Sequence, residues 1–139
     1  MPRVALTRRV TFAAAHRYRR ADWSDAKNQE VFGACANPNY HGHGYACEVT
    51  VRGDVDRATG MVIDLAVLDR VLHDEVVARF DHRNLNLEVP EFGEGGMIPT
   101  GENLAQLIAG RVQGALGARA EVSRVVLRED ESLWSEWTP

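Results

Sequence analysis

Hydrophobic and polar residues alternate along residues 3–16, the first regular segment of the chain. Apart from Arg8, the even positions are apolar and end on His16, whereas the odd positions are mostly arginine and threonine. A period of two is typical of a β-strand with one buried face. We therefore predict a first strand over residues 3–16, with its even positions in the core and His16 at the buried end.

The same alternation returns in residues 41–52. One parity carries His41, His43, Tyr45, Cys47, Val49 and Val51. We expect this parity to continue the buried face, with Cys47 as a small core residue. The polar turn at residues 54–60 follows, and the two strands are predicted to pair antiparallel.

Two later segments have apolar residues every three or four positions, the period of an amphipathic helix. The first runs from the capping residue Asp64 to about residue 80, and His73 lies off its apolar stripe, so we expect it to be exposed and without a special role. The second begins after Pro99, with Thr100 as its cap, and ends at Gly117.

Residues 121–129 and 133–138 have strand character and are joined by the polar turn 130–132. The element order is β-β-α-α-β-β, which predicts an α+β fold with an antiparallel sheet and two helices on one face. Residues 18–40 and 85–97 are predicted to be irregular connections, with a weakly signalled helix within residues 22–32. A chain of 139 residues fits one domain, residues 1–139.

The net charge of −4 excludes a general attraction to nucleic acid or to anionic membranes. No segment has the pattern of a signal peptide or a membrane span, so we expect a cytoplasmic protein. Seven cationic residues fall within the first thirty: Arg3, Arg8, Arg9, Arg17, Arg19, Arg20 and Lys27. They fit either a phosphate-binding edge or an ordinary solvated surface.

His41 and His43 are two residues apart in a predicted strand, so both imidazoles project from one face. With His16 they offer three nitrogen ligands, which suit Zn²⁺ with an open fourth position, the arrangement of a catalytic site. A lone histidine at the end of a strand is more often a core residue, and Cys35 is an alternative fourth ligand of a closed structural site.

If Cys35 is not a ligand, a nearby metal and histidine would lower the pKa of its thiol and make it a general base or nucleophile. Asp81 and His82, at the predicted end of the first helix, offer an oriented acid–base pair, although a helix-end histidine often only meets the helix dipole. Glu129, at a strand end, can accept two hydrogen bonds from the N–H and NH₂ edge of a guanine or pterin ring; the alternative is a solvated acidic turn.

Six short segments together resemble the 6-pyruvoyltetrahydropterin synthase family: FAAAHR (residues 12–17), FGAC (32–35), NPNYHGH (37–43), DRATGM (56–61), DHRNLN (81–86) and PTGEN (99–103). The resemblance runs over nearly the whole chain. It implies the tunnelling fold, or T-fold, in which trimers close a barrel, commonly stack as hexamers, and hold their sites between subunits.

The resemblance also implies a role for each candidate residue. Zinc would be bound by His16, His41 and His43, Cys35 would accept a proton, and His82 with Asp81 would form the relay that activates Cys35. Glu129 would anchor the pterin, and Thr100 and Glu102 match a second pterin-contacting segment.

The implied reaction converts 7,8-dihydroneopterin triphosphate to 6-pyruvoyltetrahydropterin with loss of triphosphate and without a nicotinamide. The spacing between Cys35 and His41 resembles the pyruvoyl-forming enzymes, whereas the 6-carboxytetrahydropterin synthases of queuosine biosynthesis typically have a shorter one. The carboxy product, a non-catalytic pterin-binding protein and a structural zinc module remain alternatives. Gly44 and Gly101 depart from the family, in which Asn and Thr are usual.

Overall fold

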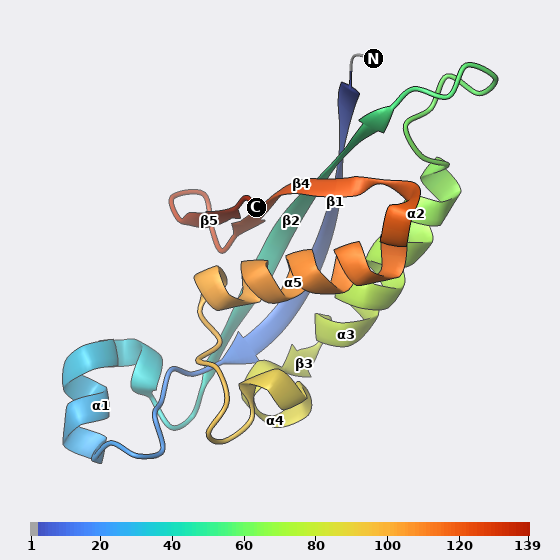
Figure 1. Ribbon diagram of the computed structural model, residues 1–139. Helices are drawn as coiled ribbons and strands as arrows, with labels where there is room; N and C mark the ends of the chain where they lie inside the picture. Colours follow the sequence, from blue (N-terminus) through green and yellow to red (C-terminus); the bar gives the residue numbers. More distant parts are fainter. Residues whose placement is uncertain (1–2) are drawn as a thin grey trace.

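The computed structural model describes residues 3–139, and its main feature is one curved sheet of five strands (Figure 1). Their spatial order is β3-β1-β2-β4-β5. The strands are β1 (Arg3–His16), β2 (His41–Asp54), β3 (Arg83–Asn84), β4 (Glu121–Arg128) and β5 (Trp134–Trp137). The four long segments predicted as strands are therefore confirmed.

The β1–β2 hairpin is the longest pairing in the fold. It is antiparallel, as predicted, and its register runs from Arg3 opposite Asp54 to His16 opposite His41. Residues directly opposite one another in a sheet share a face. The register therefore places the ends that carry the histidines side by side.

The expectation of a wholly antiparallel sheet is wrong at one edge. Strand β3 pairs parallel with β1, with Ala14 opposite Arg83, and the amide of His82 donates a hydrogen bond of 2.7 Å to the carbonyl of Ala13. A strand of two residues is too short to show a hydrophobic period, so the sequence pattern could not reveal it.

Helical segments cover one face of the sheet (Figure 1). The predicted first helix consists of α2 (Leu65–Leu72), a wider π-helical turn η2 (His73–Val77) and α3 (Ala78–Phe80), and Asp64 caps it by accepting from Ala66 N at 2.9 Å. The second is α5 (Gly101–Leu116), followed by η4 (Gly117–Arg119). Within residues 3–139, no helix is both long and apolar enough to cross a bilayer.

The core lies between this helix layer and the sheet, where Phe12 and Tyr45 stack with ring centroids 4.9 Å apart. Cys47 is fully buried and His73 is exposed, as predicted. The prediction that the apolar even positions of β1 are buried is wrong for Val4 and Leu6, which are 46% and 36% exposed. The N-terminal end of β1 projects beyond α5 (Figure 1).

The two predicted connections contain short helical segments. The first holds α1 (Asp25–Phe32), which confirms the weak helix signal, and the turn η1 (Gly33–Ala36). The second holds α4 (Leu85–Glu88) and the turn η3 (Pro90–Phe92), where a plain loop was expected. Leu85 and Phe92 are buried there, so tertiary packing stabilises turns that are too short to be stable alone.

Candidate active site

Three imidazoles meet at the end of the β1–β2 hairpin. His16 comes from β1, and His41 and His43 come from β2. One ligand atom of each residue lies within 4.8 Å of the ligand atoms of the other two. Of the three, His16 is fully buried, His43 is half-buried and His41 is exposed, so the expectation that the β2 histidines continue the buried face holds only in part.

Hydrogen bonds orient two of these rings. His16 Nδ1 lies 2.9 Å from the carbonyl oxygen of Pro99 and 3.2 Å from the hydroxyl of Tyr45. Because a carbonyl only accepts, the bond to Pro99 assigns the proton to Nδ1 and leaves the lone pair on Nε2. His43 Nδ1 lies 3.0 Å from the carbonyl of Gly44, which assigns the same tautomer.

The chemistry of this donor set fits a metal ion. His16 Nε2 is buried and has no hydrogen-bond partner among residues 3–139. A buried nitrogen lone pair without a partner is costly, and a metal ion would satisfy it. Histidine ligands commonly donate their other ring N–H to a carbonyl, the arrangement of His16 and His43. Three imidazoles suit a borderline ion such as Zn²⁺.

The electrostatics favour the neutral form of His16 and His41, which is the form that binds a metal. The pKa of His16 is lowered to about 4, mainly by burial; the bond to Pro99 opposes this shift, and the neighbouring His41 and His43 add to it. The pKa of His41 is also lowered, first by burial and then by His43.

Cys35 lies close to this group but is not part of it. It belongs to η1, which begins at Gly33, and its carbonyl accepts a hydrogen bond of 2.7 Å from the amide of Tyr18. The ring of Tyr18 meets the ring of His16 edge to face, with centroids 5.1 Å apart. The potential metal-ligand group contains the three histidines without Cys35, which favours the open site over the closed site with Cys35 as fourth ligand.

Glu129 lies beside the histidines. It follows β4, its side chain is 10% exposed, and its Oε1 is 3.7 Å from His43 Nε2. Burial raises the pKa of the Glu129 carboxyl, whereas His43 counteracts the shift. The carboxylate therefore faces the histidine group.

Asp81 and His82 lie at the other edge of β1. Asp81 Oδ1 accepts from the amide of Ala13 at 2.9 Å and lies 3.0 Å from His82 Nδ1, and these contacts lower the pKa of Asp81, the Ala13 bond most. His82 has a positive φ of 59°, and its side chain is 85% exposed. Within residues 3–139, no hydrogen bond connects this pair to Cys35.

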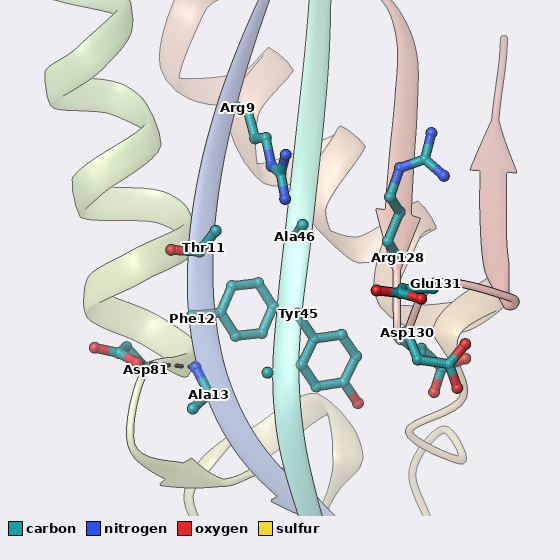
Figure 2. A pocket seen from close by; sticks show the side chains of 12 residues that line it. Arg9, Thr11, Phe12, Ala13, Tyr45, Ala46, Asp81, Arg128, Asp130 and Glu131 are labelled. Carbon is teal, nitrogen blue, oxygen red and sulfur yellow. Dashed lines mark hydrogen bonds between the residues drawn. The ribbon is translucent and has the colours of Figure 1, made fainter.

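One cavity of about 630 Å³ includes both Asp81 and Glu129 in its walls. It lies over β1, β2 and the end of β4, and Arg9 and Arg128 extend along it (Figure 2). Thus the structure brings two of the predicted catalytic carboxylates to one cavity, although Asp81 lies next to the edge strand β3 and Glu129 follows β4, on the other side of the β1–β2 pair.

Thr100 and Glu102 are the remaining predicted contacts. The hydroxyl of Thr100 accepts from the amide of Asn103 at 3.1 Å and so caps α5 as predicted. Glu102 Oε1 lies 3.5 Å from the hydroxyl of Ser135, and its charge contributes to the raised pKa of Glu129. The Thr100 hydroxyl is therefore used as the N-cap of α5, whereas Glu102 lies near the candidate site.

The N-terminal arginines separate into groups. Arg17, Arg19 and Arg20 line a second cavity of about 640 Å³, opposite the glycine-rich loop 93–96. Arg19 and Arg20 each pair with a carboxylate at 2.7 Å, whereas the guanidinium carbon of Arg17 lies 5.2 Å from the centre of the Tyr40 ring. The first residue that lines this cavity, Arg17, directly follows His16 in the chain.

Sequence reasoning missed three contributors to the site. Tyr45 shares the parity of His41 and His43, so its contact with His16 had a signal in the alternation. The Pro99 carbonyl and the Tyr18 amide are backbone groups, and the side-chain pattern holds no signal for them.

Comparisons with known proteins find relatives along nearly the whole chain. The profile of the 6-pyruvoyl tetrahydropterin synthase family matches residues 5–139. The human protein named 6-pyruvoyl tetrahydrobiopterin synthase is 41% identical over 111 residues, which are 80% of this chain and 75% of the relative. An Archaeoglobus fulgidus protein named putative 6-carboxy-5,6,7,8-tetrahydropterin synthase is 37% identical over 97 residues, 69% of this chain and 73% of that one.

A solved structure gives the same result for the fold. The Caenorhabditis elegans 6-pyruvoyl tetrahydropterin synthase superimposes with a TM-score of 0.93 at 34% identity, covering 100% of this chain and 97% of the other. This match confirms the predicted T-fold subunit. By sequence over nearly its whole length and by fold, the chain belongs to the 6-pyruvoyl tetrahydropterin synthase family.

Proposed function

We propose that the protein is a zinc-dependent lyase that converts 7,8-dihydroneopterin triphosphate to 6-pyruvoyltetrahydropterin and releases triphosphate. The observation that carries this proposal is the buried, unpartnered Nε2 of His16 beside His41 and His43, with the carboxylate of Glu129 next to them. The human relative, which bears the name of this activity, supports it.

The three histidines would hold zinc through their unprotonated nitrogens. Bound there, zinc would polarise the side-chain hydroxyls of the substrate and make the adjacent C–H and O–H groups more acidic. His16 would be held in the ligating tautomer by Pro99 and Tyr45, and His43 by the carbonyl of Gly44. These contacts set the tautomer that zinc binding would require.

Cys35 would accept the proton that the substrate side chain loses. Its carbonyl accepts a hydrogen bond from the amide of Tyr18, whose ring contacts His16, and this chain of contacts supports a place for Cys35 next to the histidine group. The charge and hydrogen bonding of Asp81 would hold His82 as the relay that passes protons to and from the site. The pterin gains the electrons that its side chain loses, so the balance needs no nicotinamide.

The exposed position of His82 supports an assembly in which sites form between subunits. Its side chain is 85% exposed next to the edge strand β3, where a second copy of the chain can approach. Val4 and Leu6 also expose apolar surface on the projecting part of β1. We therefore propose a homotrimer or a hexamer, and light scattering coupled to size-exclusion chromatography would measure its mass.

Glu129 would anchor the pterin by accepting hydrogen bonds from its N–H and NH₂ groups. The triphosphate would lie in the cavity that Arg17, Arg19 and Arg20 line. Arg17 directly follows the candidate zinc ligand His16 in the chain. Guanidinium groups bind phosphate oxygens in a bidentate manner, which suits a highly charged leaving group. Arg17, which has no carboxylate ion pair among residues 3–139, is the main candidate.

The test is incubation with 7,8-dihydroneopterin triphosphate followed by mass spectrometry of the pterin product. We expect 6-pyruvoyltetrahydropterin and free triphosphate. A carboxylated pterin with acetaldehyde would identify the 6-carboxytetrahydropterin synthase reaction, whose name the Archaeoglobus relative carries. Tight pterin binding without turnover would indicate a non-catalytic binding protein, and unfolding on chelation without pterin affinity would indicate a structural zinc module.

A further inference from the structure

Gly101 is the first residue of α5, and its backbone does not require a glycine. It is not among the glycines with positive φ, which are Gly33, Gly60, Gly95 and Gly117. Glycine is also a less favourable helix residue than alanine, because it loses more backbone freedom on folding. Local conformation therefore gives no reason for glycine at this position.

The space around Gly101 gives a reason. A Cβ atom added there would lie 2.8 Å from Glu129 Oε2, 3.0 Å from Ser135 Oγ and 3.3 Å from Glu129 Cδ. Real Cβ atoms essentially never approach another heavy atom as closely as the first of these distances. The carboxylate of Glu129 thus occupies the volume that any larger residue at position 101 would need.

The other oxygen of the same carboxylate faces the histidines. Glu129 Oε1 lies 3.7 Å from His43 Nε2, so the carboxylate is confined between Gly101 on one side and His43 on the other. We propose that Gly101 is a positioning residue: the absence of a side chain there sets the location of the Glu129 carboxylate, and with it the place where the pterin is anchored. This inference rests on the proposed function of Glu129.

A side chain at position 101 would affect the site more than the fold. The atoms that it meets are the ends of two side chains and not backbone, so they can move away. The displaced carboxylate would then meet the pterin edge at altered distances and angles, and hydrogen bonds weaken steeply when they are misaligned. Because a pair of charge-assisted bonds is involved, a small displacement has a large effect on binding.

The experiment compares Gly101→Ala with Gly110→Ala, a matched control in the same helix whose added Cβ would meet nothing within 4 Å. Pterin affinity is measured by quenching of biopterin fluorescence, an unreactive probe, together with KM and kcat for the substrate. We expect Gly101→Ala to weaken biopterin binding about tenfold or more and to raise KM more than it lowers kcat, whereas Gly110→Ala leaves both unchanged. Zinc content should stay at the parent value in both variants, and the melting temperature should not fall in either, because alanine is a better helix residue than glycine.

Glu129→Asp provides the second test, because its shorter side chain leaves room for a Cβ at position 101. Adding Gly101→Ala to Glu129→Asp should cost less than adding it to the parent protein, and the same double variant should restore folding if Gly101→Ala alone is unstable. Equal costs in both backgrounds, or no restoration, would overturn the role of Gly101.

Glu129→Gln separates this inference from the proposed function. Unchanged biopterin binding by Glu129→Gln would remove Glu129 as the pterin anchor, and both proposals would fail at that point. Weaker binding by Glu129→Gln combined with full binding by Gly101→Ala would overturn the positioning role alone.

Discussion

The amide of Tyr18 donates a hydrogen bond of 2.7 Å to the carbonyl oxygen of Cys35. Tyr18 follows His16 by two residues, so this bond attaches the turn η1 to the end of β1 that carries the buried histidine. The position of the cysteine therefore depends on backbone contacts, and its thiol can be changed without disturbing them.

Cys35→Ala should abolish turnover while leaving zinc and pterin binding intact, because it removes the proton acceptor and keeps the backbone bond to Tyr18. Loss of a general base typically costs about 10²- to 10⁴-fold in rate. Steady-state kinetics and zinc analysis of the purified variant measure both effects. Unchanged turnover would exclude Cys35 from the mechanism.

Cys47→Ala is the control for this experiment. Cys47 is fully buried in β2, and burial raises the pKa of its thiol to about 12. We expect this variant to lose about 1–2 kcal/mol of unfolding free energy through the cavity it creates, with turnover retained.

Zinc should bind at close to one ion per chain and depend on the buried histidine. His16→Asn should lose the ion because it removes the buried nitrogen that has no protein partner, whereas the exposed His73→Asn should retain it. Elemental analysis after dialysis measures both. A metal-free protein with full activity would contradict the proposed role of zinc.

Tyr45→Phe should weaken zinc binding without unfolding the protein. It removes the hydroxyl 3.2 Å from His16 Nδ1 but keeps the ring that stacks on Phe12. Groups that orient a metal-ligating histidine are typically worth about 10- to 100-fold in metal affinity, and the Pro99 contact remains, so we expect about tenfold. Competition with a chelator measures the change, and an unchanged affinity would assign the orientation to Pro99 alone.

Arg17→Ala should raise KM for the triphosphate substrate about tenfold, and the effect should decrease as salt screens the charges. Arg8→Ala is the matched control, because Arg8 pairs with Asp69 at 2.8 Å and does not line this cavity. Equal KM values for the two variants would place the triphosphate elsewhere.

Asp81→Asn should reduce stability at neutral pH and not in acid. The Ala13 amide, followed by His82, lowers the pKa of Asp81 below its ordinary value of 3.8. A carboxyl whose pKa is lower in the folded state contributes stability above its unfolded pKa and loses it as pH falls through the folded value. Urea unfolding should therefore show a difference between parent and variant that is largest near pH 7 and decreases below about pH 4. A difference that is constant with pH would mean that the charge is not involved.

The sequence by itself determined the long strands, the capped helices and the residue types of the candidate metal site. These features are periodic or local, because alternation records which side of a strand is buried and a cap lies within a few residues of the helix it starts. For the same reason, the shared face of His41 and His43 followed directly from their spacing. The family resemblance added the residues that periodicity could not connect.

Only the tertiary structure decided how these parts meet. The parallel pairing of β3, the carbonyl of Pro99 on His16 and the close approach of Glu129 to Gly101 join residues that are distant in the chain. His16 and Pro99 are 83 positions apart in the chain. The contact uses the backbone carbonyl of Pro99, and a hydrophobic pattern describes side chains only. Such contacts depend on the packing of whole elements, so side-chain periodicity cannot specify them.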